Sequence, residues 1–264
     1  NELKAQGIDV INMSVGEPDF FTPDHIKQAA KQAVDDNFSF YSPVAGFPDL
    51  KKAICDKLKK ENDLEYKPAQ IVVSNGAKQS ICNVILSVID KDDEVIIPAP
   101  YWVSYPEMVK LADGKPVFVY AGIDQNFKIT AQQLEEAITP KTKALILCSP
   151  SNPTGSVYTA EELKAMAEVL ERYPNVIIIA DEIYEHINYI GKHESIAQFT
   201  KLRDRVVVVN GVSKGYAMTG WRIGWIAAPQ WIASACSMLQ GQYTSGPSSI
   251  SQKAAVAAYI GDQS

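Results

Sequence analysis

Residues 205–225 read R-V-V-V-V-N-G-V-S-K-G-Y-A-M-T-G-W-R-I-G-W. The β-branched run Val206–Val209 ends at Asn210-Gly211, a pattern that predicts a buried strand followed by a turn. Lys214 comes directly after that turn. A lysine at the end of a buried strand loses solvation, which lowers its pKa and favours the free amine that can form a Schiff base with an aldehyde. The alternative interpretation of Lys214 is a solvated loop lysine. Residues elsewhere in the chain are needed to distinguish it from a Schiff-base lysine.

The same stretch also matches a hydrolase motif. Gly211–Gly215 has the form G-x-S-x-G after a strand, with Ser213 in the place of the nucleophile. That fold places its catalytic histidine after the serine in the chain. The three histidines of this sequence, His25, His186 and His193, all precede Ser213. A hydrolase triad therefore cannot be completed unless further chain supplies a histidine.

Composition limits the classes of function. With 264 residues, of which 46% are hydrophobic, the chain can bury the core of one large domain. A net charge of −6 disfavours nucleic acid and acidic membrane surfaces as partners. No apolar stretch approaches the length of a membrane span. The 4 cysteines form no C-x-x-C pair, which favours reduced thiols and a cytoplasmic protein.

Strand and helix patterns alternate from Gln70 onward. This rhythm predicts an α/β fold with a mostly parallel sheet of about seven strands, covered by helices on both faces. The expected strands are Ile71–Ser74, Glu94–Ile97, Lys115–Tyr120, Ala144–Cys148, Val176–Ala180, Val206–Val209 and Ile223–Ala227.

Helix signals are clearest before the first strand. Thr22 is expected to cap a helix that has Pro23 in its first position. A second helix is expected from Pro48, because Leu50, Ile54 and Leu58 then share one face.

Ligands of such sheets bind at the carboxyl ends of the strands. The residues that carry chemistry at those ends are Asn75–Lys78, Tyr101-Trp102, Ser151-Asn152, Asp181 with Tyr184, and Ser213-Lys214. Because these ends meet at one edge, we expect the residues to form one site.

One part of this set suits a phosphate and a flat ring. Gly76 and Ala77 open a helix whose bare N–H groups can hold a phosphate, and Arg222 can add a bidentate contact. Trp102 can stack on a heteroaromatic ring. Taken singly, an ordinary glycine turn and a core tryptophan are the better explanations of these residues.

The other part suits a pyridine ring. Asp181 follows an apolar strand, and a buried carboxylate needs a cationic partner, either a protonated pyridine nitrogen or an arginine. Asn152 and Tyr184 are uncharged donors that can share one phenolate oxygen, although capping and turn roles are open to both. Combined with Lys214 and the phosphate site, the set predicts pyridoxal 5′-phosphate as cofactor.

Four stretches carry a resemblance to a known family. They resemble the class I aminotransferases of fold-type I, and the bacterial aspartate aminotransferase branch most closely. The stretches are Tyr101–Glu107, Ser151–Gly155, Asp181–Tyr184 and Ser213–Arg222. The resemblance implies that residues 21–264 form the large cofactor-binding domain and residues 1–20 the N-terminal segment of the small domain. It also implies that the rest of the small domain, with the arginine for the substrate α-carboxylate, is missing from this chain.

The resemblance also implies roles for the catalytic residues. Lys214 would form the Schiff base and move a proton between substrate and cofactor. Asp181 would pair with the pyridinium nitrogen. Asn152 and Tyr184 would bind the ring oxygen, and Trp102 would stack on the ring.

The phosphate would be held by Gly76, Ala77 and Arg222. Relatives carry a serine three residues before the lysine as a further phosphate ligand, where this chain has Gly211. Ser213 is expected to substitute for it in part.

Substrate and subunit contacts follow from the same resemblance. Gly16 would contact the substrate α-carboxylate through its backbone, next to Trp102 and Asn152. Lys78 would receive a distal carboxylate; a surface lysine is the alternative, although the helix dipole disfavours a cation there. Tyr41 would reach the phosphate of a neighbouring subunit, which requires a homodimer.

The predicted function is transfer of the amino group of aspartate to 2-oxoglutarate by a ping-pong mechanism. Transamination of prephenate or aromatic amino acids is an alternative, as is another lyase or decarboxylase that uses the same cofactor. A cofactor-binding sensor domain is the non-enzymatic alternative. A metal site built from Glu182, His186 and His193 has little support, and no metal is predicted.

Overall fold

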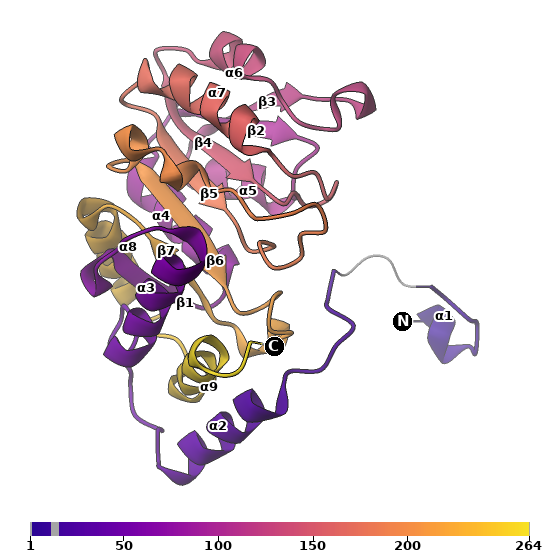
Figure 1. The fold of residues 1–264 in the computed structure, drawn as a ribbon, viewed down its shortest axis with the longest axis vertical. Coiled ribbons are helices and arrows are strands. Elements are labelled where there is room, and N and C mark those ends of the chain that lie inside the picture. The colour runs from indigo at the N-terminus through magenta and orange to yellow at the C-terminus, as the bar shows by residue number, and fades with distance from the viewer. Residues whose placement is uncertain (1, 12–15, 264) are drawn as a thin grey trace.

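The computed structural model describes residues 2–11 and 16–263, and Figure 1 shows its arrangement of helices and strands. The helices are α1 (Glu2–Ala5), α2 (Asp24–Asp35), α3 (Pro48–Asn62), α4 (Ala77–Val88), α5 (Ser104–Leu111), α6 (Ala131–Ala137), α7 (Ala160–Glu171), α8 (Gln230–Tyr243) and α9 (Ser249–Ile260). The strands are β1 (Ile71–Ser74), β2 (Glu94–Ala99), β3 (Lys115–Tyr120), β4 (Thr142–Cys148), β5 (Ile177–Asp181), β6 (Val206–Gly211) and β7 (Gly224–Ala227).

The described strands form one seven-stranded sheet in the order β1-β7-β6-β5-β4-β2-β3. The predicted α/β fold and the mostly parallel sheet are confirmed. Strands β3, β2, β4, β5 and β6 pair in parallel, whereas β7 is antiparallel to both of its neighbours, β6 and β1. Strand β7 therefore runs against the other six, and its amino end lies at the edge where the other strands have their carboxyl ends.

Alternation along each central strand divides the core between the two faces of the sheet. Along β6, Val206 and Val208 join one hydrophobic cluster, and Val207 and Val209 join the other. The first cluster is covered by α2, α3, α6, α7 and α9, and the second by α4, α5 and α8. Both faces of the sheet are thus buried, as the β-branched strand sequences require.

Two helix predictions have different outcomes. Leu50, Ile54 and Leu58 of α3 are all fully buried, as predicted from their spacing. The predicted cap of α2 is wrong: Pro23 occupies the cap position, and no side chain caps the helix. Thr22 instead donates its hydroxyl to the carbonyl of Ala217, at 2.6 Å.

The N-terminal helix stands apart from the sheet. Helix α1 contains no buried residue and lies away from the layered body in Figure 1. The assignment of residues 1–20 to a separate small domain stays a prediction. Within residues 2–11 and 16–263, no helix combines the length and the apolar character that crossing a bilayer requires.

Candidate active site

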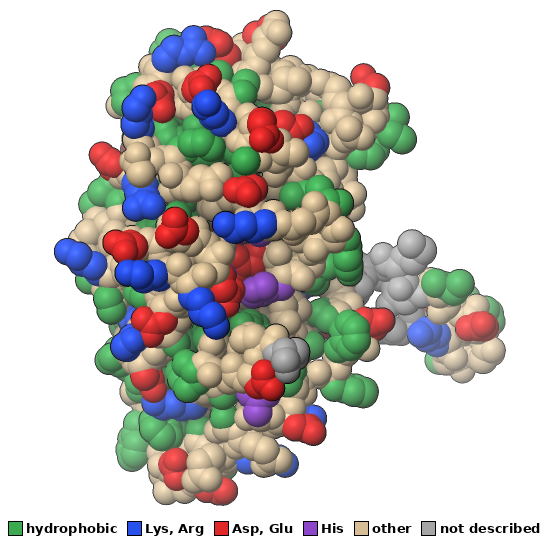
Figure 2. All heavy atoms as spheres, viewed as in Figure 1, with side chains coloured by type: hydrophobic (Ala, Val, Ile, Leu, Met, Phe, Trp, Pro, Cys, Tyr) green, Lys and Arg blue, Asp and Glu red, His purple; other side chains and the backbone are tan. Residues whose placement is uncertain are grey.

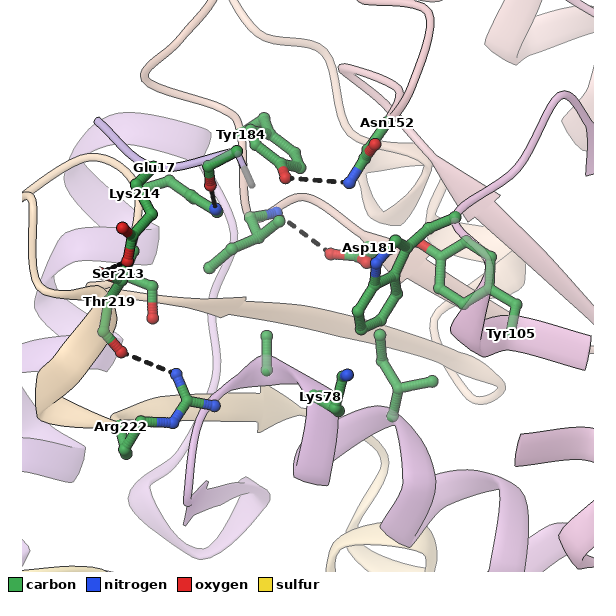
Figure 3. Close-up of a pocket in the computed structure, with 15 residues that line it drawn as sticks. Glu17, Lys78, Tyr105, Asn152, Asp181, Tyr184, Ser213, Lys214, Thr219 and Arg222 are labelled. Atoms are coloured by element: carbon green, nitrogen blue, oxygen red, sulfur yellow. Dashed lines mark hydrogen bonds between the residues drawn. The ribbon is translucent and has the colours of Figure 1, made fainter. Parts of the chain in front are cut away.

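A cavity of about 390 Å³ opens at the carboxyl edge of the sheet. Its size lies in the range of small-molecule sites. Figure 3 shows the side chains that face it. They are Gly16, Glu17, Ala77, Lys78, Ile81, Trp102, Tyr105, Asn152, Asp181, Ile183, Tyr184, Ser213, Lys214, Thr219 and Arg222. The cavity therefore brings together every predicted site residue except Tyr41 and Gly76.

Asp181 is the buried acid of the cavity. It ends β5, and only 4% of its surface is exposed. No cationic side chain among the described residues forms an ion pair with it. Its carboxylate accepts hydrogen bonds from the Tyr105 hydroxyl at 2.6 Å and from the Ile183 N–H at 3.3 Å. Burial outweighs these bonds and raises the pKa of Asp181 to about 6.

Lys214 faces the same cavity from the turn after β6. Its side chain is half-buried, and this burial lowers its pKa, as predicted from its position after the strand. The charge of Glu17 opposes the shift, whereas the charge of Arg222 adds to it. The Lys214 ammonium donates a hydrogen bond to the carbonyl of Gly16 and lies 5.4 Å from the ring centre of Tyr184.

Asn152 and Tyr184 meet above Asp181 (Figure 3). The Asn152 Nδ2 donates to the Tyr184 hydroxyl at 3.2 Å. The pKa of Tyr184 is raised to about 12, mainly by burial, so the phenol keeps its proton near neutral pH. The pair thus presents two uncharged donors at one point, which suits a negatively charged oxygen on a ligand.

The amino end of α4 lies unusually close to the sheet because three positions lack side chains. A Cβ on Gly224 would lie 2.1 Å from the nitrogen of Ala77, and a Cβ on Gly76 would lie 2.3 Å from Arg222 Nη2. Gly76 also has a φ of +84°, which favours glycine. Gly224 pairs with Gly211 across β6 and β7. Any larger residue at these positions would fill the space in front of the helix.

Positive charge gathers at this helix end without a matching anion. Among the described residues, the N–H groups of Ala77 and Lys78 have no acceptor, as expected of the first turn of a helix. Within residues 2–11 and 16–263, the guanidinium of Arg222 donates only to the carbonyls of Thr219, at 2.8 Å, and Asn75, at 3.2 Å. A cation beside a helix amino end is electrostatically unfavourable, so the arrangement suits a bound anion such as phosphate.

The glycine at position 211, where relatives carry a serine, has a structural cause. A Cβ at this position would lie 2.7 Å from the carbonyl oxygen of Ile223 and 2.8 Å from Gly224 Cα. The close pairing of β6 with β7 therefore leaves no room for a serine here. Ser213 borders the cavity two residues later, where a hydroxyl can face a ligand.

Trp102 and Lys78 lie next to each other in the lining of the cavity. Lys78 is exposed, and its ammonium lies 4.8 Å from the ring centre of Trp102. A cation over the face of an indole is a favourable contact. Lys78 has no carboxylate partner among the described residues, so its charge is available to a ligand in the cavity.

Gly16 and Tyr41 differ in their position relative to the cavity. Gly16 borders the cavity, but it is its carbonyl that contacts Lys214. Tyr41 lies outside the cavity with 97% of its side chain exposed. A contact from Tyr41 to the site of a second subunit is not tested by a single chain and stays a prediction.

Sequence reasoning missed three polar residues of the cavity, Glu17, Tyr105 and Thr219. Tyr105 donates to Asp181, and Thr219 donates its hydroxyl to Glu17 at 2.9 Å. Tyr105 lies three residues after Trp102 in one of the quoted stretches, so a helical spacing could have placed it beside the indole. Nothing in the sequence around Glu17 and Thr219 indicates that segments 202 residues apart meet here.

The histidines lie away from the reacting groups. None of the described residues around the cavity is a histidine, although Ser213 borders it. This arrangement counts against the hydrolase alternative, in which a histidine must contact the serine.

The three residues considered as metal ligands are split between two clusters. His193 Nε2 lies 3.1 Å from Glu182, whereas His186 turns toward a different carboxylate on α3. Glu185 lies between the two clusters and forms a buried ion pair with Lys57. Since an ammonium already neutralises the shared carboxylate, the clusters are explained as ion pairs.

The residues fit the pyridoxal phosphate that the resemblance implies. In the part of the chain that the structure describes, the buried Asp181 carboxylate has no cationic partner, the first N–H groups of α4 have no acceptor, and Arg222 has no carboxylate partner. Glycines keep the space in front of that helix end open. A phosphorylated ring with a basic nitrogen satisfies all of these groups at once.

Fold and cavity together define an α/β domain with a small-molecule site at the carboxyl edge of its sheet, and the family is shown by comparison with known proteins. The chain belongs to the aminotransferase class I and II family, whose sequence model matches residues 8–264. It is 53% identical over 99% of its length to the aspartate/prephenate aminotransferase of Nitrosomonas europaea, of which it covers 66%. The chain thus spans slightly less than two thirds of the length of this relative.

Solved structures give the same family. The aspartate aminotransferase from Rhizobium meliloti superposes with a TM-score of 0.97 at 46% identity, covering 99% of this chain and 66% of that protein. The aspartate aminotransferase from Thermus thermophilus with maleate gives 0.95 at 40% identity, with 98% and 67% covered. The large-domain fold expected from the resemblance is confirmed.

Proposed function

We propose that the protein is an aminotransferase that uses pyridoxal 5′-phosphate to move the amino group of aspartate to 2-oxoglutarate by a ping-pong mechanism. The observation that supports this proposal most is the convergence of Lys214 and Asp181 on one cavity (Figure 3). One offers an amine with a lowered pKa, and the other offers a buried carboxylate without a cation. Few ligands need both groups at once.

When bound, pyridoxal phosphate supplies an aldehyde for the amino group and an electron-withdrawing ring. Lys214 Nζ then takes and returns the proton at the substrate Cα, a task for which a lowered pKa is required. The Asp181 carboxylate holds a proton on the ring nitrogen by its negative charge. Asn152 and Tyr184 donate to the ring oxygen, and Trp102 limits the tilt of the ring.

Phosphate binding anchors the group at the other end of the cavity. Ala77 donates its free N–H, Gly76 keeps the approach open, and Arg222 contributes a planar pair of donors. Ser213 adds a hydroxyl at the border of the same space. These contacts fix the ring so that Lys214 reaches only one side of the substrate Cα.

Lys78 supports a substrate with a second carboxylate. Its ammonium, which has no carboxylate partner among the described residues, lies next to Trp102 in the cavity lining, and Gly16 borders the same cavity. In Thermus thermophilus the related structure holds maleate, which is a dicarboxylate. Aspartate and glutamate have the same two charges as maleate.

Prephenate is the second candidate for the amino acceptor. Relatives at 53% identity are named aspartate/prephenate aminotransferase, and one from Petunia hybrida carries both activities in its name. Prephenate has two carboxylates, so Lys78 suits it as well as 2-oxoglutarate.

The proposal includes a homodimer in the cytoplasm and a two-domain organisation. Tyr41 and its neighbour Phe40 are 97% and 82% exposed, which suits a contact with a second subunit. The four free cysteines suit a reducing compartment. Residues 21–264 would form the large domain, and residues 1–20 would belong to the small one.

The test is a panel of amino donors added to the full-length protein loaded with pyridoxal phosphate, followed by the absorbance change of the first half-reaction. Aspartate and glutamate should react, and Lys214→Ala should abolish the reaction because no other amine in the cavity is placed to move the proton. A Lys214→Ala protein that reacts at the wild-type rate would refute the proposal.

The same panel tests the substrate. Lys78→Ala should raise the KM for aspartate by about 10-fold or more relative to alanine, since a hydrogen bond to a charged group is worth about 1.5–3 kcal/mol. Lys110→Ala is the matched control, because Lys110 forms an exposed ion pair on α5 with Glu107. Equal effects of Lys78→Ala on aspartate and alanine would exclude a carboxylate-binding role.

A further inference from the structure

Tyr105 connects two groups of the cavity that come from different parts of the chain. It lies in the first turn of α5, with only 2% of its surface exposed. Its hydroxyl donates to Asp181 Oδ2 at 2.6 Å. Its ring meets the indole of Trp102 edge-on, with ring centres 5.4 Å apart and an interplanar angle of 87°. Its N–H donates to the Trp102 carbonyl at 3.1 Å.

We propose that Tyr105 is a positioning residue, which holds the Asp181 carboxylate and the Trp102 indole in a fixed mutual orientation through its hydroxyl hydrogen bond and its edge-on ring contact. The inference rests on the proposed function, in which Asp181 meets the ring nitrogen and Trp102 stacks on the ring. A flat ligand can use both contacts only if carboxylate and indole keep one relative geometry. Tyr105 is the side chain that contacts both.

Geometry gives each carboxylate oxygen of Asp181 a separate task. Oδ2 is taken by the Tyr105 hydroxyl, and Oδ1 accepts the Ile183 N–H at a longer distance of 3.3 Å. A short bond on one oxygen and a long one on the other fix the rotation of the carboxylate about its Cβ–Cγ bond. Each oxygen accepts one of these bonds, so the carboxylate retains capacity for a further donor, such as a protonated ring nitrogen.

The hydrogen bond also bears on the charge of Asp181. The groups that act on this carboxylate are Tyr105 from α5, Cys148 from β4, Tyr184 and Glu182 from the segment after β5, and Lys214 from the turn after β6. Burial raises the pKa of Asp181 most, and the bond from Tyr105 is the largest influence that lowers it. The hydroxyl thus helps to keep the carboxylate ionised at neutral pH.

A phenol suits this task better than other donors. The pKa of Tyr105 lies well above its usual value, chiefly because of burial and also because of the nearby Asp181 charge, so the hydroxyl does not ionise. It therefore always donates and never competes for the negative charge. Phenylalanine would keep the edge-on contact with Trp102 and remove only the hydrogen bond.

The experiment measures the pKa of Asp181 directly in the cofactor-free protein by carbon NMR of labelled aspartate, with Asp181→Asn identifying the signal by its loss. In Tyr105→Phe we expect this pKa to rise by about one to two pH units, the equivalent of one lost hydrogen bond to a charged group. Tyr101→Phe is the matched control, because the Tyr101 ring stacks on Phe118 at 4.9 Å and does not contact Asp181. In Tyr101→Phe, the pKa of Asp181 should equal the wild-type value.

The pKa of Asp181 in the cofactor-free protein does not depend on transamination. The positioning role of Tyr105 and the aminotransferase function can therefore be refuted independently. An Asp181 pKa that is the same in Tyr105→Phe and wild type would overturn the inference even if the protein is an aminotransferase. Should Tyr105→Phe not fold, the wild type still gives an answer: replacing solvent protons by deuterons should shift the Asp181 carboxyl carbon signal through the tyrosine hydroxyl. Absence of that isotope shift would equally overturn the inference.

Discussion

Asp181 carries its negative charge where water hardly reaches it. Its environment offers two hydrogen bonds and no ion pair among the described residues, and burial raises the pKa of the carboxyl to about 6 in spite of those bonds. Such a group destabilises the cofactor-free fold when it is ionised. A ligand with a positive charge at this point relieves that cost, so the same residue couples stability to binding.

This coupling predicts the pH dependence of folding in the cofactor-free protein. The native pKa of Asp181 lies above its ordinary value of 3.8, so the native state binds the proton more tightly than the unfolded chain. The free energy of unfolding should therefore fall as the pH rises from about 4 to about 6, by about 3 kcal/mol from this residue. Urea titrations of wild type and Asp181→Asn across this range measure the contribution.

The comparison between the two proteins isolates Asp181 from all other titrating groups. The free energy of unfolding of Asp181→Asn, minus that of wild type, should be larger at pH 7.5 than at pH 4. The reason is that wild type buries a charged carboxylate at pH 7.5, whereas asparagine has no charge to bury. Identical pH profiles for both proteins would show that the carboxylate is not strained in the fold.

Single residues of the site could be predicted unevenly from the sequence. Lys214 and Asp181 follow apolar strands, so strand periodicity alone places them at one edge of the sheet. Tyr105 could not be assigned, because a tyrosine on a buried helix face is most simply a core residue. Its partner lies 76 residues away in the sequence, and only the packing of α5 against the sheet brings them together.

At the scale of elements, the pairing of β6 with β7 sets the position of α4. Gly211 and Gly224 face each other across the two strands, and neither position has room for a Cβ. The missing side chain of Gly224 allows the nitrogen of Ala77 to approach the sheet. The depth of the space in front of α4, where we propose that the phosphate binds, is therefore fixed by a strand that contributes no side chain to it.

Gly224→Ala should consequently damage both stability and cofactor binding. The new methyl group would lie 2.1 Å from the nitrogen of Ala77, so α4 or β7 has to move. Overpacking of this kind costs about 1–3 kcal/mol, and we expect a free energy of unfolding lower by that amount. The Kd for pyridoxal phosphate, measured by fluorescence quenching, should rise by about 10-fold, the effect of about 1.4 kcal/mol.

Gly220→Ala provides the control for this substitution. Gly220 lies four residues earlier, and a Cβ there meets no atom within 4 Å. It should leave stability and cofactor affinity close to wild type. If Gly224→Ala behaved like Gly220→Ala, the close approach of α4 to the sheet would not be what forms the proposed phosphate site.

Elements could be predicted from the sequence more fully than their directions. All seven strands are present, and β1 and β3 have the predicted bounds. The antiparallel direction of β7 could not be read from its residues, because a short apolar strand looks the same in either direction. That direction matters, since it puts Arg222, which precedes β7, at the same edge as Lys214.

At the scale of the whole molecule, an exposed pair of aromatic side chains lies on a well-anchored segment. Phe40 and Tyr41 are 82% and 97% exposed. The segment is nevertheless held by α9: Ser249 donates to the backbone carbonyl of Phe40 at 2.7 Å, and Gln252 donates to the side-chain hydroxyl of the following Ser42 at 2.9 Å. A fixed backbone that presents apolar rings to solvent suits a contact with a second copy.

Mixing two inactive variants tests whether Tyr41 serves the site of the other subunit. Tyr41→Phe lacks the hydroxyl, and Lys214→Ala lacks the amine. If Tyr41 acts across a symmetric dimer, a mixed dimer contains one site with both groups intact. Assayed at limiting pyridoxal phosphate, the mixture should recover about a quarter of wild-type activity, because half of the dimers are mixed and each has one intact site.

A role for Tyr41 within its own subunit gives a different outcome. Every site in the mixture would then lack one of the two groups, and activity would stay at the sum of the separate variants. Size-exclusion chromatography of the mixed sample shows whether dimers have formed at all, so a monomer is recognised as such.

Strand β1 has one further consequence, which concerns the order in which the chain is made. It lies at the border of the sheet and pairs only with β7 among the described strands, with Ile71 opposite Ala227. A ribosome that adds about 5–20 residues per second releases the second of these residues many seconds after the first. Through that interval the apolar segment Ile71–Ser74 lacks its partner strand, although Val73 can already donate to the Ala45 carbonyl. Synthesis thus leaves most of the backbone donors and acceptors of β1 unpaired until β7 has been made.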